Sequence, residues 1–492
     1  MSDEALPAVR RLPFMTRLAY SVGSIAFGLK AVAIGVVMLF YNQVLGLPAV
    51  WVSMAIGAAL IVDAVSSPVI GQMSDMWRSR WGRRHPFMYA AALPASLAVW
   101  ALLNPPPGWA GPALFAWMTG CIIAARISIA LFEIPNASLL PELASDYDDR
   151  TALSAWRNML LIVVPVIVIV TALVLFLTPF VNARGQHMPG QLNPAGYARY
   201  GVALAVLIFA AILVSALGTH REIPHLSRPE PHPSAKALFG TIATTLLNRN
   251  FLVLTLSGMV AGIGAGLVGG LTDYFNTFFW QLSARQISVL TGAVGVAPFA
   301  AVAIGPFLSG RFGKKPALLA TFTLSLAAGI LPVGLRLLGL LPPNGSPVIL
   351  PLLVVDAFFA CTLVIVGLII LTSMMADIVE QVQVTTGRRS EGLLFSADTM
   401  LKQIVTGVGA MGTGLILQVV HFPERAVPGQ VPPEVLTRLA IIYLPINVTT
   451  SLVSIALIAL FSITRQDHER HLAKIADLAM TDPPAPNEAP RV

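Results

Sequence analysis

The stretch DAVSSPVIGQMSDMWRSRWGRRHPF, residues 63–87, joins a lone acid in an apolar run to a cluster of arginines. The acid is Asp63, at the end of Ala-Leu-Ile-Val-Asp, and a second apolar run begins at Met88. Between them, four arginines lie within seven residues, at positions 78, 80, 83 and 84, in a chain that is only 11% charged. A basic junction between two apolar runs indicates two membrane-spanning segments joined by a short loop.

The composition of the whole chain supports a membrane protein. Its 492 residues are 56% hydrophobic with a mean hydropathy of +0.76, whereas soluble domains are about 45–50% apolar and about 25% charged. The apolar runs are continuous and near the roughly 20 residues that cross a bilayer as a helix. Membrane β-barrels show alternating segments of about 10 residues instead. We therefore expect an all-α membrane protein.

Twelve apolar segments follow one another along the chain. They fall at 19–43, 49–73, 87–104, 109–136, 154–180, 199–218, 250–279, 287–308, 316–339, 347–378, 391–420 and 435–463. A long polar stretch with Pro and His separates the sixth from the seventh, as in a surface linker. The sequence thus predicts twelve transmembrane helices in two pseudo-symmetric six-helix bundles, residues 1–218 and 250–464, with a cytoplasmic linker at 219–249 and a cytoplasmic tail at 465–492.

The distribution of Lys and Arg gives the expected orientation. If both termini are cytoplasmic, the loops on that side carry most of the cations, as the positive-inside rule requires. These cations are Arg78, Arg80, Arg83, Arg84, Arg150, Arg221, Arg228, Lys236, Arg249, Arg311, Lys314, Lys315, Arg388 and Arg389. The arginine cluster therefore marks a cytoplasmic loop beside lipid headgroups. For the same reason, the net charge of +7 does not indicate a nucleic-acid partner.

The loop after the second helix recurs in the other half. GQMSDMWRSRWGRRHPF starts at Gly71 and GPFLSGRFGKKPALL starts at Gly305, and both place an arginine, an aromatic residue, a glycine and two cations after that glycine. A six-plus-six chain with this duplicated loop resembles the major facilitator superfamily, whose halves are parallel repeats with the solute site between them at mid-membrane. We expect a charged gate on one face, since membrane anchoring alone explains the arginines but not the acid at position 75. The expected gate residues are Asp75, Arg83, Arg84 and Arg311.

Other kinds of site find little support in the sequence. Cys121 and Cys361 each lie in an apolar run and suggest neither a disulfide framework nor a metal pair. The sequence contains no HExxH, GxSxG or P-loop motif, so we expect no catalytic residue, no cofactor and no resident metal. Three histidines gather in the linker, where a metal site is the alternative to a solvated loop. Residues 1–17 lack the pattern of a cleaved signal peptide.

Ionisable residues inside the apolar segments point to the function. A charge at bilayer depth costs from about 3 to more than 10 kcal/mol, so it usually faces a cavity or a partner. Five such residues lie in the first, second, fourth and fifth helices, namely Lys30, Asp63, Arg126, Glu133 and Arg157. A cluster that holds both signs of charge can exchange a proton or exchange one cation for another. The sequence therefore predicts a solute site coupled to a cation.

The role of the ionisable residues in the apolar segments of the second half stays open. The candidates there are Asp273, Asp356, Asp377, Glu380, Asp398 and Lys402. Asp273 and Asp356 fit either a functional role or an interhelical hydrogen bond. The two acids near the cytoplasmic end of the tenth helix fit either the headgroup level or a gate. Asp398 and Lys402 are four residues apart and can pair on one helix face, for structure or for function.

Together these motifs resemble the glycoside–pentoside–hexuronide:cation symporters, the melibiose-permease branch of the major facilitator superfamily. The matching stretches are VDAVSSPVIGQMSDMWRSRWGRRHPF, FEIPNASLLPELASDYDDRTALSAWRN, MMADIVEQ and GRRSEGLLFSADTMLKQ, in this order. The resemblance runs from about Arg17 to the twelfth helix. It implies a secondary active transporter that moves a glycoside-like solute by alternating access, as a monomer in the inner membrane of a bacterium.

The resemblance implies a cation site with fewer charged ligands than in the family. The family's first cation-site aspartate matches Asp63, and the second falls on Ser67, with Ser66 between them. A fourth-helix threonine that helps hold sodium falls on Ala130. The expected cation-coupling residues are Asp63, Ser66, Ser67 and Glu133. Because one carboxylate with two hydroxyls holds Na⁺ poorly, we expect coupling to H⁺, or uncoupled transport, over coupling to Na⁺.

The implied solute site also departs from the family. The sugar-binding aspartate falls on Glu133 and the fifth-helix arginine matches Arg157, but Lys30 stands where the first helix should carry an acid. The sugar-stacking tryptophan falls on Ala137, and the eleventh-helix lysine aligns with Gln403. The expected solute-binding residues are Lys30, Arg126, Glu133, Arg157 and Lys402. The added cations favour an anionic solute such as a uronide, unless Lys30 only neutralises Glu133.

Two other functions remain open on the same fold. The missing tryptophan at Ala137 favours a transporter or flippase of lysolipids or other amphiphiles. A receptor that does not transport is the second alternative.

Overall fold

Among the residues that the structure describes, twelve helices are long and apolar enough to cross a membrane, as predicted. The structure is a computed structural model and describes residues 12–144, 147–182, 184–226, 248–386, 391–463, 467 and 470. Most of the expected linker and nearly all of the expected tail lie outside these residues. The same is true of Arg228, Lys236, Arg388 and Arg389.

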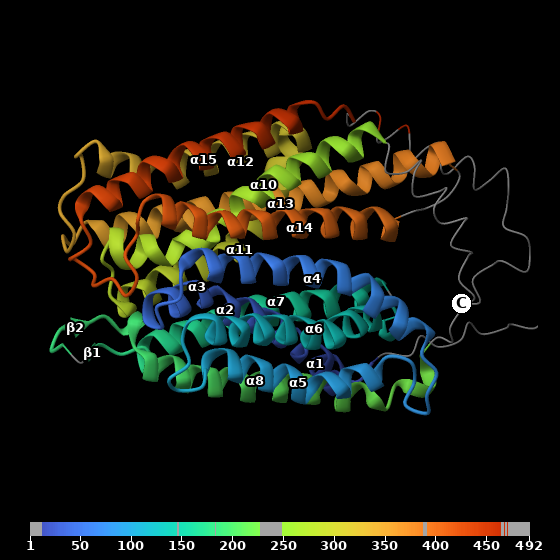
Figure 1. Cartoon of the computed structure of the whole chain (residues 1–492). Coiled ribbons are helices and arrows are strands. Elements are labelled where there is room, and N and C mark those ends of the chain that lie inside the picture. Colours follow the sequence, from blue (N-terminus) through green and yellow to red (C-terminus); the bar gives the residue numbers. More distant parts are fainter. Residues whose placement is uncertain are drawn as a thin grey trace, which may run out of the picture.

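The first six spans form the N-terminal half, drawn from blue to green in Figure 1. The first span is made of α1 (Phe14–Val22), α2 (Ser24–Gly35), α3 (Val37–Leu39) and the π-turn η1 (Phe40–Val44). It is followed by α4 (Ala49–Met76), α5 (His85–Leu103), α6 (Gly111–Leu143), α7 (Tyr147–Thr171) with η2 (Ala172–Phe176), and α8 (Pro194–His220). A hairpin of β1 (Phe180–Val181) and β2 (His187–Met188), then η3 (Gly190–Leu192), precede α8, and η4 (Ile223–His225) follows it.

The last six spans form the C-terminal half, drawn from yellow-green to red. They are α10 (Arg249–Tyr274) with the π-turn η5 (Phe275–Phe279), α11 (Ala284–Phe312), α12 (Lys314–Leu337), α13 (Ile349–Thr386), α14 (Glu391–Val419) and α15 (Pro433–Ala459). The π-turn that ends the first span thus recurs at the end of the seventh. This recurrence supports the expected parallel repeat of the two halves.

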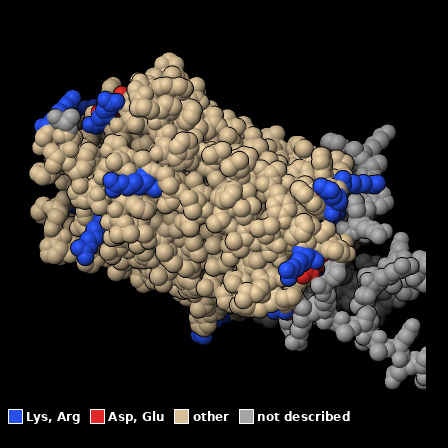
Figure 2. Space-filling view, turned by 90° about the horizontal axis from the view of Figure 1, so that it is seen from below, with Lys and Arg blue, Asp and Glu red and all other residues tan. Residues whose placement is uncertain are grey.

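Large apolar side chains cover the outside of the bundle. Leu217, Phe307 and Val419 are 61%, 62% and 64% exposed, which would be costly in water but is stabilising in hydrocarbon. Figure 2 shows most Lys and Arg side chains near the two ends of the molecule, with a mostly uncharged surface between them. This surface is that of an integral membrane protein.

Glycines bring α4 and α14 into main-chain contact beside the expected site. A Cβ atom on Gly57 would lie 2.5 Å from the carbonyl oxygen of Gly407, so only glycine permits this crossing of the two halves. Small residues allow such close approach between membrane helices. From the crossing, α4 continues to Asp63 and α14 leads back to Gln403, and the two side chains meet.

The two halves also meet at the end of the bundle that holds η1, η3 and η5, which we call the sealed end. There the Tyr274 hydroxyl donates to Asn42 Oδ1 at 2.6 Å, and Gln191 Nε2 donates to the Leu282 carbonyl at 2.8 Å. At the opposite end, the two copies of the repeated loop make ion pairs within their own halves. The structure therefore has its two halves bonded together at one end of the solute path.

Candidate functional site

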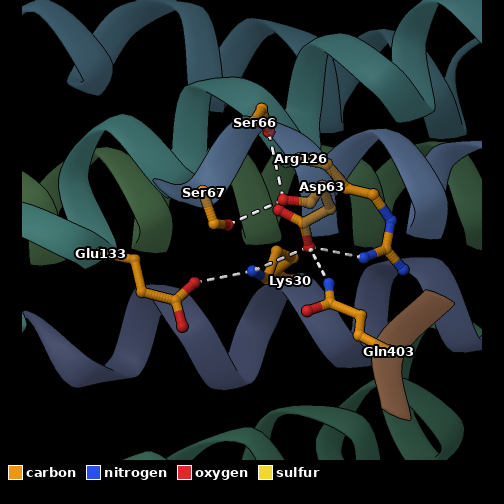
Figure 3. Close-up of polar contacts among 7 residues, drawn as sticks. All are labelled: Lys30, Asp63, Ser66, Ser67, Arg126, Glu133 and Gln403. Atoms are coloured by element: carbon orange, nitrogen blue, oxygen red, sulfur yellow. Dashed lines mark hydrogen bonds and ion pairs between the residues drawn. The ribbon is translucent and has the colours of Figure 1, made fainter. Parts of the chain in front are cut away.

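Asp63 lies near the middle of α4 and is the centre of a buried charge cluster (Figure 3). Its Oδ2 accepts hydrogen bonds from Arg126 Nη1 and from Gln403 Nε2, each at 2.9 Å. Lys30 Nζ lies 3.9 Å from the same oxygen. The Asp63 side chain is only 5% exposed, so these positive and donor groups replace water around its charge.

Lys30 links Asp63 to Glu133. Its Nζ donates to Glu133 Oε2 at 2.7 Å, and the Glu133 side chain is 34% exposed. Two cations, Lys30 and Arg126, thus face two carboxylates, and the formal charges of this cluster balance. Lys30 lies where it neutralises Glu133, one of the two roles that the sequence left open for it.

Ser66 and Ser67 lie next to Asp63 but use their hydroxyls elsewhere. Both donate to the main-chain carbonyl of Asp63, at 3.2 and 2.8 Å, and neither contacts its carboxylate (Figure 3). Bonds of this type to the preceding turn are common for serine in membrane helices. Among the described residues, no group of three or more His, Cys, Asp and Glu side chains could hold a metal ion.

Arg157 lies beside this cluster without joining it. Its guanidinium carbon is 5.4 Å from the centre of the Phe27 ring, one turn from Lys30 on α2. Its Nε is buried without a hydrogen-bond partner, and it makes no ion pair with a residue that the structure describes. Within the described part of the chain, Arg157 is therefore a cation without an acidic partner, next to a balanced cluster.

Lys402 points away from Asp63, into the C-terminal half. Its Nζ donates to Asp398 Oδ2 at 2.6 Å, and Thr255 donates to the other oxygen of Asp398 at 2.9 Å. A Cβ on Gly258 would lie 1.9 Å from the Lys402 side chain, so the lysine packs against bare backbone of α10. Gln403, about 100° further round α14, is the residue that crosses to the N-terminal half.

Two expected gate residues of the first loop, Arg83 and Arg84, contact the end of α6. Arg83 and Arg84 both contact Glu142 Oε1, with Arg84 at 2.8 Å, and Arg84 also lies 3.7 Å from Asp75 and donates to the Ser138 carbonyl. Burial lowers the pKa of the Arg84 guanidinium, while the charge of Glu142 acts in the opposite direction. The cluster therefore fastens the loop to the end of α6.

The second copy of the loop keeps the glycine of positive φ but is shorter and has fewer charges, since only Gly313 separates α11 from α12 whereas eight residues separate α4 from α5. Gly82 and Gly313, which precede the paired cations of each loop, have φ of 74° and 84°, a conformation that favours glycine. In this copy, Lys314 Nζ donates to Asp377 Oδ1 on α13 at 2.7 Å. Arg311 is exposed and lies over the Phe312 ring, 5.9 Å from its centre.

Three contacts of the site were not anticipated from the sequence. Gln403 was aligned only as a replaced lysine, and Glu142 and Lys314 were not assigned a partner. The repeat itself offered a signal, because the fourth helix of one half corresponds to the tenth, and each carries an acid near its loop end.

The chain was compared with known proteins. The family of MFS/sugar transport proteins matches residues 19–465. The chain belongs to this family. It is accordingly a secondary transporter and an integral membrane protein, not an enzyme, and the expected major facilitator fold and symporter-like family are confirmed.

Similar proteins agree with this assignment. The isoprimeverose transporter of Lactiplantibacillus pentosus is 25% identical over 431 residues, which cover 85% of this chain and 84% of the relative. An uncharacterized symporter of Synechocystis is 23% identical over 509 residues, 87% and 89% of the two chains. The lactose permease of Leuconostoc lactis is 23% identical over 393 residues, 76% of this chain and 55% of that protein.

Solved structures share the fold at low identity. A bacterial homologue of the human lysosomal transporter Spinster has a TM-score of 0.62 at 14% identity, covering 94% of this chain and 99% of its own. The xylose transporter XylE of E. coli has a TM-score of 0.61 at 14% identity, covering 93% and 98%. At this identity, the two likenesses show the shared fold alone.

Proposed function

We propose that this protein carries a glycoside-like solute across the inner membrane of a bacterium by alternating access, coupled to protons. The observation that carries this proposal is the balanced charge cluster of Lys30, Asp63, Arg126 and Glu133 at the middle of the spans. Relatives named for isoprimeverose and lactose transport support a sugar-like solute. The solute binds at the half-exposed Glu133, whose oxygens can accept hydrogen bonds from sugar hydroxyls.

A negative group on the solute is the finer part of the proposal. Arg157 supports it, because this free guanidinium lies beside the cluster and could bind a carboxylate in two parallel hydrogen bonds. The neighbouring cations Lys30 and Arg126 already have acidic partners. The proposed solute is therefore a uronide or another acidic glycoside held by Arg157.

Proton coupling is assigned to Asp63 with Ser66, Ser67 and Glu133 around it. Support comes from the oxygens near Asp63, since both serine hydroxyls donate to the main chain rather than face an ion. With the serine hydroxyls turned to the main chain, Asp63 offers a single carboxylate, which suits a proton better than a metal ion, because a metal ion needs several oxygen ligands. With cytoplasmic termini, the sealed end faces outward and the arginine-rich loops, with Asp75, form the inner gate.

Uptake into proteoliposomes tests the proposal. The panel is isoprimeverose, lactose, a glucuronide and a lysophospholipid, each under an imposed pH gradient or an imposed Na⁺ gradient. We expect pH-driven accumulation of a glycoside, strongest for the glucuronide, and its loss in Asp63→Asn and Glu133→Gln. Arg157→Gln should lower the uptake of the glucuronide more than the uptake of lactose.

Three outcomes would contradict the proposal. Transport of the lysophospholipid alone would favour an amphiphile carrier. Accumulation driven by Na⁺ would replace H⁺ as the coupling ion. Normal transport in both acid variants would remove the cluster from the site.

A further inference from the structure

A cavity of about 320 Å³ lies between the two halves near the sealed end, and none of the four residues of the charge cluster lines it. Its N-terminal wall is largely apolar, with Val36 and Leu173 among its residues, and its C-terminal wall includes Asp273 and Thr291. Its volume is at the lower end of the range for small-molecule sites. Because both halves line it, this cavity must change shape when the halves move apart.

The carboxylate of Asp273 stands unpaired in this cavity. Asp273 lies on α10, about two turns before η5 ends at Phe279. It makes no hydrogen bond or ion pair with any residue in the described part of the chain. Asp63 and Glu133, by contrast, each contact a fixed cation. An ionised group at this depth without a partner is costly, so the Asp273 carboxylate requires a positive partner, and no described residue supplies one.

A second acceptor in the same cavity is also free. Gln191 is only 3% exposed, and its Nε2 donates to the Leu282 carbonyl at 2.8 Å. Its Oε1 is buried without a hydrogen-bond partner. Buried polar atoms nearly always have a partner, so this oxygen indicates that the cavity receives a donor.

The other groups around Asp273 leave its charge unopposed. The lining residues from α2, α3, α7 and η2 are apolar or glycine, and those from α11 are Ile287 and Thr291. From α8 comes Tyr197, whose hydroxyl donates to the Gln191 carbonyl at 2.8 Å. Tyr274, the next residue on α10, donates to Asn42. No cation lines the cavity among the described residues.

We propose that Asp273 is a second proton-binding residue, which exchanges its proton with the compartment that the sealed end faces. Asp273 is the one carboxylate among the lining residues, and the other side-chain oxygens there are the neutral ones of Gln191, Tyr197, Thr272, Thr277 and Thr291, a poor set for a metal ion, whereas a proton needs only the carboxylate. Opening of the sealed end would part α2 and α8 from α10 and α11 and bring water to the acid. This inference rests on the proposed coupling of transport to protons.

Asp273→Asn tests it in proteoliposomes with radiolabelled isoprimeverose as the probe. For one proton per solute, a gradient of one pH unit supports about tenfold accumulation. We expect the variant to lose this accumulation and to keep isoprimeverose exchange between the two sides. Accumulation equal to wild type would overturn the proposal, and so would accumulation that follows Na⁺ in wild type and is lost in the variant.

Asp356→Asn is the matched control. Asp356 is also an acid without a partner among the described residues, but it lines a neighbouring cavity of about 340 Å³, which shares Thr272 and Thr291 with the first cavity and is lined by C-terminal residues alone. We expect this variant to accumulate isoprimeverose like wild type. An equal loss in both variants would contradict a specific role for Asp273.

Infrared spectroscopy tests the proton without any solute. The difference spectrum of the reconstituted protein between acidic and alkaline buffer should contain the carbonyl band of a protonated carboxyl group that Asp273→Asn lacks. Identical spectra of wild type and variant would overturn the proposal. If the band behaves as expected but wild type carries no glycoside, the proposed function fails while the proton site stands.

Discussion

In the N-terminal half, Asp63 and Glu133 each contact a fixed cation, whereas Asp273 and Asp356 in the C-terminal half contact none within the described residues. The repeated loops also differ. Two arginines contact Glu142 in the first copy, and Lys314 contacts Asp377 in the second. Two halves with one backbone layout thus carry different charge arrangements.

This difference shows how one repeated fold can divide two tasks. A carboxylate with a built-in cation gives a polar site that suits hydrogen bonding to a solute, and it takes up a proton only in exchange for that cation. A carboxylate without one has to obtain its positive partner from solution. The glycine crossing of Gly57 and Gly407 joins the two arrangements and brings Gln403 of one half to Asp63 of the other.

The largest effect is expected from Arg126→Gln. It leaves the buried Asp63 without its closest cation, and removing one partner of a buried ion pair typically costs about 3–5 kcal/mol. Thermal unfolding in detergent should show this loss, with partial recovery when Asp63→Asn is added. Lys402→Gln, in the more exposed pair with Asp398, should cost less. Equal losses of stability in Arg126→Gln and Lys402→Gln would contradict the expected difference between the two halves.

A smaller effect should separate the two repeated loops. Glu142→Gln removes the shared partner of two buried arginines, and hydrogen bonds to charged groups contribute about 1.5–3 kcal/mol each. Asp377→Asn removes the partner of Lys314, whose side chain is 34% exposed, and should cost about 1 kcal/mol or less. Unfolding midpoints of the two variants give the comparison. A larger loss of stability for Asp377→Asn than for Glu142→Gln would contradict this expected order.

A similarly small effect is expected from Gln403→Met. It removes the hydrogen bond between the halves at Asp63 but keeps Arg126 in place, so we expect a loss of about 1–2 kcal/mol in stability. Because α4 and α14 still touch through glycine, transport should continue. Gly407→Leu, which inserts a side chain at the crossing, is the contrasting variant. If Gln403→Met stops transport while Gly407→Leu does not, the bond rather than the crossing joins the halves.

The fold could be predicted because it follows from local patterns. The length of each apolar run gave the twelve spans, and the four-residue spacing of Asp398 and Lys402 placed both on one face of α14, where they pair. The ends were less well predicted. The fourth apolar segment was predicted to end at residue 136, but α6 continues to Leu143, because its last turns emerge from the hydrocarbon and need no apolar face.

The site could be predicted only in part, since its pairings are between helices. The sequence identified Lys30, Asp63, Arg126 and Glu133 as intramembrane charges, but their spacing does not say which cation meets which acid. Gln403 lies 340 residues from Asp63, and a neutral side chain gives no signal of cost at bilayer depth. Contacts of this kind depend on helix packing, which the order of residues does not reveal.

The glycine crossing of α4 and α14 has a mechanical consequence. In any rotation of one half against the other, points near the axis move least, and a bare main-chain contact offers no interleaved side chains to hinder turning. If the halves turn about this crossing, Asp63 and Gln403 remain close together while the two ends swing through larger arcs. The charge cluster would then lie near the axis of rotation, and the cavity at Asp273 would lie further from this axis and move more.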